Sequence, residues 1–186
     1  MKKVEDTKMI YEYKTANLSQ ASDLARYEYK TANLSQASDL ARIEAFYQSP
    51  IFEKRFRNES QDVISIINEE ITSQPNNTLP NNKKFFIISG RSIVPVAIAN
   101  LYFHYPERNT ATISLFLSLE EAIIEYLFSD IFLVIKANIR IKNIQLQLLP
   151  SQLSMKEFWL NKGFSEIKNG IPSSKNYTTL TLPIKR

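Results

Sequence analysis

The chain has 186 residues, of which 44% are hydrophobic and 23% charged; this favours one globular domain with a sizeable core and excludes a disordered chain. Cysteine is absent and only 3 glycines occur, which excludes disulfide frameworks and thiolate–metal sites and argues against a glycine-rich phosphate-binding loop. The formal net charge of +4 is spread along the chain, so we expect no nucleic-acid partner.

The N-terminal residues Met1–Met9 are charged, and no apolar segment of a secretory signal follows them. A tandem duplication follows instead. Residues 11–26 and residues 27–42 both read YEYKTANLSQASDLAR. Two copies of sixteen residues are too few and too short for a solenoid. Each copy holds a strand pattern followed by a helix start.

A fold built around one copy has one place for it. The second copy runs directly into the helical pattern Ile43–Tyr47, so we predict that it occupies the strand and helix positions. The first copy is then displaced, disordered or swapped into a neighbouring molecule to form a homodimer. A single long helix over Thr15–Ser49 is also locally allowed, because no glycine or proline interrupts it. We therefore divide the chain into an N-terminal segment, 1–26, and a single domain, 27–186.

The next elements are two helices and a loop. The pattern predicts a helix over Leu34–Tyr47 that Pro50 ends, and a second helix over Ser60–Thr72 with one apolar face. The stretch 74–82 is rich in proline and asparagine and predicts an exposed loop.

Three strand patterns follow, over Lys84–Ser89, Val94–Tyr105 and Thr110–Leu117. The turns between them, at 90–92 and 106–109, predict an antiparallel meander. Ser118 is the expected N-cap of a helix that runs to about Ala137, with Glu121 completing a capping box. That apolar stretch is interrupted by charges and is too short to span a membrane, so we expect a cytoplasmic protein with no membrane association.

The last predicted elements are a strand over Ile141–Leu149, a helix over Ser154–Asn161 capped by Gly163, a segment at Phe164–Ile167 and a strand over Tyr177–Leu182. The whole pattern predicts a mixed α+β fold, with a central, mostly antiparallel sheet and flanking helices.

This order of elements resembles that of the GNAT family of N-acetyltransferases over roughly residues 27–184. The segment Phe158-Trp159-Leu160-Asn161-Lys162-Gly163-Phe164 is similar to the family's aromatic-aromatic-x-x-x-Gly-Phe segment. The resemblance implies that acetyl-CoA or another acyl-CoA binds between the fourth and fifth strands of the family's sheet. It places the donor along Leu115, Phe116, Leu117 and Ser118, and beside Trp159.

The sequence departs from the family at the donor site. The family has a glycine-containing, basic loop before the helix that follows its fourth strand, but the stretch 115–122 here has no glycine and no basic residue. Glu120 and Glu121 place negative charge where a phosphate should lie. Trp159 stands where the family commonly has an acidic tyrosine, and an indole N–H does not release a proton near neutral pH. Gln152 and Met155 stand where the family often has asparagine and alanine.

Three residues are candidates for catalysis. His104, the only histidine of the chain, could act as a base toward an amine. Glu107 could bind or deprotonate the amine, and Tyr177 could replace the missing acid. Each also has an ordinary structural explanation, at a strand end, in a turn or in a strand.

Two functions stay open. One is an acyl-CoA-dependent N-acyltransferase with an atypical donor site, which transfers an acyl group to a small-molecule or protein amine. The other is a catalytically inactive module of the same fold, a pseudoenzyme that binds a partner. Side chains that fill the gap between the strands ending near Leu117 and beginning near Ile141 would favour the second.

Overall fold

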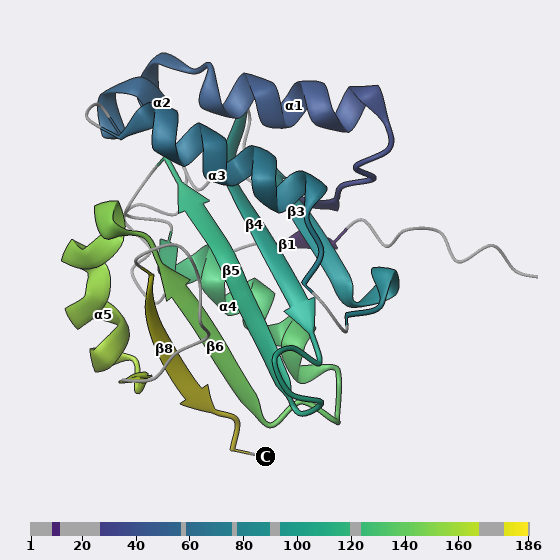
Figure 1. Cartoon of the computed structure of the whole chain (residues 1–186), viewed down its shortest axis with the longest axis vertical. Helices are drawn as coiled ribbons and strands as arrows, with labels where there is room; N and C mark the ends of the chain where they lie inside the picture. The colour runs from purple at the N-terminus through teal and green to yellow at the C-terminus, as the bar shows by residue number, and fades with distance from the viewer. Residues whose placement is uncertain are drawn as a thin grey trace, which may run out of the picture.

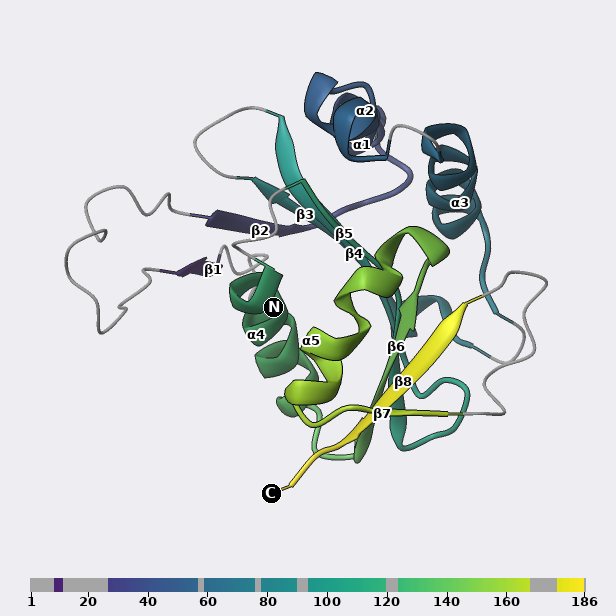
Figure 2. The same ribbon diagram turned by 90° about the vertical axis from the view of Figure 1, so that its left-hand side faces the viewer.

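The computed structural model describes residues 9–11, 27–56, 59–75, 78–89, 94–119, 124–167 and 177–185. They form a mixed α+β fold with one eight-stranded sheet and helices on both of its faces (Figures 1 and 2). The strands are β1 (Met9–Tyr11), β2 (Tyr27–Thr31), β3 (Lys83–Ser89), β4 (Pro95–Phe103), β5 (Thr110–Ser118), β6 (Asn143–Leu148), β7 (Ser165–Glu166) and β8 (Thr178–Pro183). The predicted fold class is confirmed.

The strand order is β1-β2-β3-β4-β5-β6-β8-β7. The predicted antiparallel meander is confirmed as β3, β4 and β5. Strands β5 and β6 are parallel, whereas the other neighbouring strands in the described sheet are antiparallel.

Helices α1 (Ala37–Tyr47), α2 (Pro50–Arg55) and α3 (Ser60–Thr72) cover one face of the sheet, and α4 (Ile124–Lys136) and α5 (Lys156–Asn161) cover the other (Figure 2). The short 3-10 helices η1 (Pro80–Asn82) and η3 (Pro150–Met155) precede β3 and α5. Each face has its own apolar core. The core under α1–α3 includes Ile43, Phe46, Phe52, Ile67, Ile98, Leu115 and Leu117. The core under α4 and α5 includes Ala99, Ile113, Phe116, Leu127, Ile131, Trp159 and Phe164.

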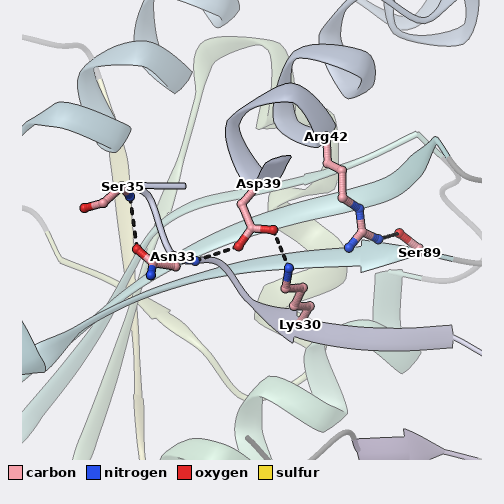
Figure 3. Close-up of polar contacts among 6 residues, drawn as sticks. All are labelled: Lys30, Asn33, Ser35, Asp39, Arg42 and Ser89. Carbon is pink, nitrogen blue, oxygen red and sulfur yellow. Dashed lines mark hydrogen bonds and ion pairs between the residues drawn. The ribbon is translucent and has the colours of Figure 1, made fainter. Parts of the chain in front are cut away.

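The second copy of the duplication supplies β2 and the start of α1. Lys30 of β2 forms an ion pair with the buried carboxylate of Asp39 in α1, and the Asn33 backbone N–H donates to Asp39 Oδ2 at 2.8 Å (Figure 3). Arg42 Nη2 donates to Ser89 Oγ of β3 at 2.6 Å. A single helix over Thr15–Ser49 is excluded, because β2 and a turn interrupt it.

The first copy enters the described residues only at Tyr11, the last residue of β1, which lies opposite Tyr27 of β2. Residues 12–26 lie outside the described part, and so does the predicted turn at 90–92.

The predicted end of the first helix at Tyr47 is confirmed, but other predicted helix boundaries are wrong. Helix α1 begins at Ala37 instead of Leu34, and Pro50 is the first residue of α2. The Ser49 hydroxyl accepts a hydrogen bond from the Phe52 N–H at 3.2 Å. Proline fits there because the first residue of a helix needs no N–H partner. Ser118 is the last residue of β5 and not an N-cap, because it still pairs with Ala97 of β4. Residues 120–123, with Glu120 and Glu121, lie outside the described part.

The bounds of α3 are those predicted, and the Gly163 cap is confirmed. Gly163 has a φ of 92°, a left-handed conformation that a residue with a Cβ adopts at a cost. It follows α5 and lets the Phe164 N–H reach the Trp159 carbonyl oxygen at 3.2 Å.

Candidate functional site: the gap between β5 and β6

The parallel strands β5 and β6 pair over only part of their length. Their register runs from Thr110 opposite Asn143 to Ile113 opposite Leu146, after which β5 continues to Ser118 without pairing with β6. The two strands therefore separate toward their C-terminal ends. At the point of separation, Ser114 is an extra residue in β5, because Asn100 and Leu101 of β4 lie opposite Leu115 and Ile113.

Gln152 of η3 bridges this gap. Its Nε2 donates to the Phe116 carbonyl oxygen of β5 at 2.6 Å, and its Oε1 accepts from the Leu149 N–H, just beyond β6, at 3.1 Å. A buried backbone carbonyl needs a hydrogen-bond donor, and β6 supplies none to Phe116 because its pairing with β5 ends at Ile113. The side-chain amide thus takes the place of a strand partner.

A pocket of about 220 Å³ opens beside this bridge. Its walls come from α2, the end of β5, the start of α4 and η3. The lining residues are Arg55, Phe56, Ser118, Ile124, Ser151, Gln152, Ser154 and Met155. Arg55 is the one charged residue of this set, and three serine hydroxyls accompany it. Guanidinium and hydroxyl donors of this kind suit an anionic group such as a phosphate.

The structure brings only some of the predicted donor-binding residues to the gap. Ser118 lines the pocket, and Phe116 borders the gap through its carbonyl oxygen. The side chains of Leu115 and Leu117 are buried in the core under α1–α3. These two residues could contact a donor only through their backbone.

Trp159 lies in the core under α4 and α5. It is 1% exposed, and its ring lies 4.8 Å from Phe128, 4.9 Å from Phe158, 5.7 Å from Phe164 and 6.3 Å from Phe116, measured between centroids. The indole therefore belongs to the same aromatic core as the Phe116 side chain.

His104 and Glu107 lie at the other end of the sheet, in the turn between β4 and β5. His104 Nδ1 contacts the Arg108 carbonyl oxygen, and Nε2 lies 3.4 Å from Asn138 Nδ2. The turn adjoins the end at which β5 and β6 are still paired. Ala111, the residue of β5 opposite Phe103, lies next to this turn. Phe116 is five residues further along β5, about 17 Å from Ala111. The structure does not bring these two candidates to the gap.

Tyr177 lies at the open end, because the next residue, Thr178, pairs with Leu148 at the end of β6. The side chain packs against the core under α1–α3. Burial and the negative charges of Glu70 and Glu69 raise the pKa of Tyr177, so its hydroxyl stays protonated at neutral pH.

Sequence reasoning missed a buried polar cluster beside the gap. Glu70, in the last turn of α3, is 8% exposed, and its Oε2 accepts three hydrogen bonds. The donors are Asn100 Nδ2 at 2.6 Å, Ser114 Oγ at 2.8 Å and Tyr102 Oη at 3.3 Å. We call Glu70, Asn100, Tyr102 and Ser114 the Glu70 cluster. One sequence signal existed: Val63, Ile67 and Glu70 share one face of α3 at helical spacing, which puts a carboxylate on the buried face.

Comparison with solved structures identifies the fold. A GNAT-family acetyltransferase from Staphylococcus aureus matches with a TM-score of 0.58 and 18% identity over 86% of this chain and 99% of that chain. An aminoglycoside acetyltransferase in complex with coenzyme A and kanamycin matches with a TM-score of 0.54 and 11% identity over 84% of this chain and 94% of that chain. A spermidine N-acetyltransferase from Vibrio cholerae in complex with coenzyme A and spermine matches with a TM-score of 0.53 and 9% identity, over 84% of this chain and 95% of that chain.

The chain therefore has the fold of the GNAT acetyltransferases, as the sequence resemblance implied. No protein-family model matches the sequence, and no curated protein matches it. None of the helices that the structure describes has the length and apolar character needed to span a bilayer.

Proposed function

We propose that the chain is an acyl-CoA-dependent N-acyltransferase with an atypical donor site between β5 and β6. The observation that carries this proposal is the separation of these two parallel strands beyond Ile113 and Leu146, next to a pocket that holds Arg55. The solved structures of this fold that contain coenzyme A support it.

In this arrangement the pantetheine arm of the donor enters the gap, and a phosphate group lies in the pocket against Arg55 and the serine hydroxyls. Arg55 comes from α2 and thus replaces, from another element, the basic residue that the stretch 115–122 lacks. An amide of the donor would compete with Gln152 for the Phe116 carbonyl oxygen. Donor binding therefore requires the Gln152 side chain to turn away.

The reaction is attack of an amine nitrogen on the thioester carbonyl carbon. A C–N bond forms and the C–S bond breaks, the amine nitrogen releases a proton to water, and the leaving thiolate takes up a proton. Because its pKa is raised, Tyr177 keeps its proton, so it serves as a hydrogen-bond donor to the thiolate and the proton itself comes from solvent.

Calorimetric titration with acetyl-CoA tests this proposal. We expect the wild-type chain to bind, and Arg55→Ala to weaken binding about tenfold, which corresponds to about 1.4 kcal/mol. Lys54→Ala is the matched control: it removes an exposed cation from the same helix that does not line the pocket, and it should change the Kd less than about twofold. Absence of heat from the wild-type chain at millimolar acetyl-CoA would reject the donor site.

A catalytically inactive binding module is the second candidate, and the Gln152 bridge favours it, because a side chain already fills the gap. Gln152→Ala opens the gap without touching the pocket residue Arg55. If neither wild type nor Gln152→Ala binds acetyl-CoA, the inactive module is the better account. Binding by either chain supports the enzyme.

A further inference from the structure

Exposed cations gather at the end of the sheet opposite the gap. Backbone hydrogen bonds join three segments there: the Lys142 N–H donates to the Asn109 carbonyl oxygen and the Ile184 N–H to the Lys142 carbonyl oxygen, both at 2.7 Å. These segments form one surface, at the lower end of the molecule in Figure 1. We call its exposed cations the basic patch; they are Arg108, Lys136, Arg140, Lys142 and Lys185.

Neighbouring acids do not neutralise the basic patch. Glu107 is the one acidic residue in the segments 104–109, 133–143 and 183–185. Within the residues that the structure describes, none of the five cations forms an ion pair with a carboxylate. Like charges that lie together without counter-charges repel one another and give the surface a positive potential. This end of the molecule therefore favours an anionic partner.

Two exposed aliphatic side chains accompany the cations. Ile139, in the loop between α4 and β6, is 78% exposed, more than any other large hydrophobic side chain that the structure describes. Leu133, in the last turns of α4, is 51% exposed. The Asn138 side chain accepts a hydrogen bond from the Arg140 N–H at 3.1 Å, and its carbonyl oxygen accepts one from the Ile141 N–H at 3.1 Å. This tight turn holds Ile139 outward beside Arg140.

The aliphatic side chains decide between the possible anionic partners. A nucleic acid offers phosphates to the cations but no apolar interior to a protruding isoleucine. A bilayer that contains anionic lipids offers both, because its headgroups attract Lys and Arg while its acyl chains take up aliphatic side chains. The expectation of no membrane association rests on the lack of a spanning stretch, and binding at a bilayer surface needs none.

We infer that the basic patch binds the surface of an anionic lipid bilayer, with Ile139 inserted between the headgroups. The inference goes beyond the proposed function and does not depend on it. Thr110 at the start of β5 lies next to the patch, whereas Ser118 in the pocket is eight residues further along, about 26 Å away. A bilayer at the basic patch therefore lies at the far end of the sheet from the donor site.

The test is co-sedimentation of the full chain with lipid vesicles in the absence of acyl-CoA. One set contains phosphatidylcholine alone, and the other also contains about 30% phosphatidylserine, both at about 0.15 M salt. We expect binding to the anionic vesicles only, and a loss of at least about tenfold in affinity at about 0.5 M salt, because salt screens the cations. Equal binding to both sets, or binding to neither, overturns the inference.

Two variants, each with a matched control, assign the binding to the patch. Arg140→Glu should weaken binding to the anionic vesicles at least about tenfold, since each cation near such a surface contributes about fivefold. Lys54→Glu makes the same change in net charge on exposed α2, at the opposite end in Figure 1, and should weaken binding less than about twofold. Ile139→Ser should cost at least about fivefold, and Ile51→Ser, at a 55% exposed site on α2, should cost less than about twofold. Equal losses in variant and control overturn the inference.

Fluorescence anisotropy with a labelled single-stranded RNA, at the same salt, distinguishes the other polyanion. We expect weaker binding to RNA than to the anionic vesicles. Tighter binding to RNA that Arg140→Glu abolishes and Ile139→Ser leaves intact would assign the patch to nucleic-acid phosphates and overturn the inference. The titration with acetyl-CoA decides the donor site separately, so either proposal can fail while the other stands.

Discussion

Replacing Asp39 by alanine should destabilise the fold, whereas the same replacement of Asp23, its equivalent in the first copy, should not. The Asn33 N–H donates to Asp39 Oδ2 at 2.8 Å, and a hydrogen bond to a charged group contributes about 1.5–3 kcal/mol. Lys30 is 41% exposed, so its ion pair adds only about 0.2–1 kcal/mol. We therefore expect Asp39→Ala to lower the free energy of unfolding by about 2–4 kcal/mol.

The first copy cannot rescue this variant by taking the place of the second. A shift of sixteen residues would continue the helix into Tyr27 and Lys30, at the places where Ile43 and Phe46 now stand. The side chains of Ile43 and Phe46 are both 0% exposed, and loss of a buried phenylalanine alone costs about 3–5 kcal/mol. A buried lysine in its place would add to that cost.

Urea denaturation at neutral pH, followed by circular dichroism, measures the difference. Because the two copies have the same sequence, Asp23→Ala is a matched control with the same neighbours along the chain. It should change the free energy of unfolding by less than about 0.5 kcal/mol. Equal losses in the two variants would refute the assignment of β2 and α1 to the second copy alone.

Two further predictions concern stability. Burial alone would raise the pKa of Asp39, but the hydrogen bonds from Lys30 and Asn33 outweigh it and hold the pKa below its usual value. The stability that depends on the Asp39 charge should therefore be complete above about pH 4 and be lost as the pH falls further. The denaturation curves of wild type and Asp39→Ala should then converge in acid. A constant difference in the free energy of unfolding down to about pH 2 would contradict this. Gly163→Ala should lower the free energy of unfolding by about 1–2 kcal/mol because Gly163 has a φ of 92°. The added Cβ would meet only Leu182 Cδ1, at 3.5 Å, so the loss comes from the backbone conformation and not from a clash. An unchanged melting temperature would contradict this.

Local patterns predicted most of the elements correctly. Ser60–Thr72 follows a helical repeat of apolar residues, and the strands of the meander are largely apolar runs that turn-forming residues separate in the sequence. The pattern failed where two structures share the same signal. Pro50 marks either the end of one helix or the first residue of the next, and Ser118 is equally compatible with a strand end and an N-cap.

Only the strand segment that borders the candidate site was predictable from the sequence. The resemblance pointed to Phe116 and Ser118, but the contacts that fill the gap join residues far apart in sequence, such as Gln152 and Phe116. The same is true of Glu70, whose partners Asn100 and Ser114 are 30 and 44 residues away. His104 attracted attention as the only histidine, yet chemistry alone could not show that it lies at the opposite end of β5.

The central claim is that an acyl-CoA donor lies between β5 and β6, and amide chemical-shift mapping with acetyl-CoA tests it most directly. We predict that the Gln152 side-chain amide and the backbone amides of Leu117 and Ser118 shift, while His104 and Glu107 at the other end of the sheet do not. The Gln152 signal should change most, because its bond to the Phe116 carbonyl oxygen has to break. Shifts centred on the turn at 104–109, or no shifts at millimolar acetyl-CoA, would contradict the claim.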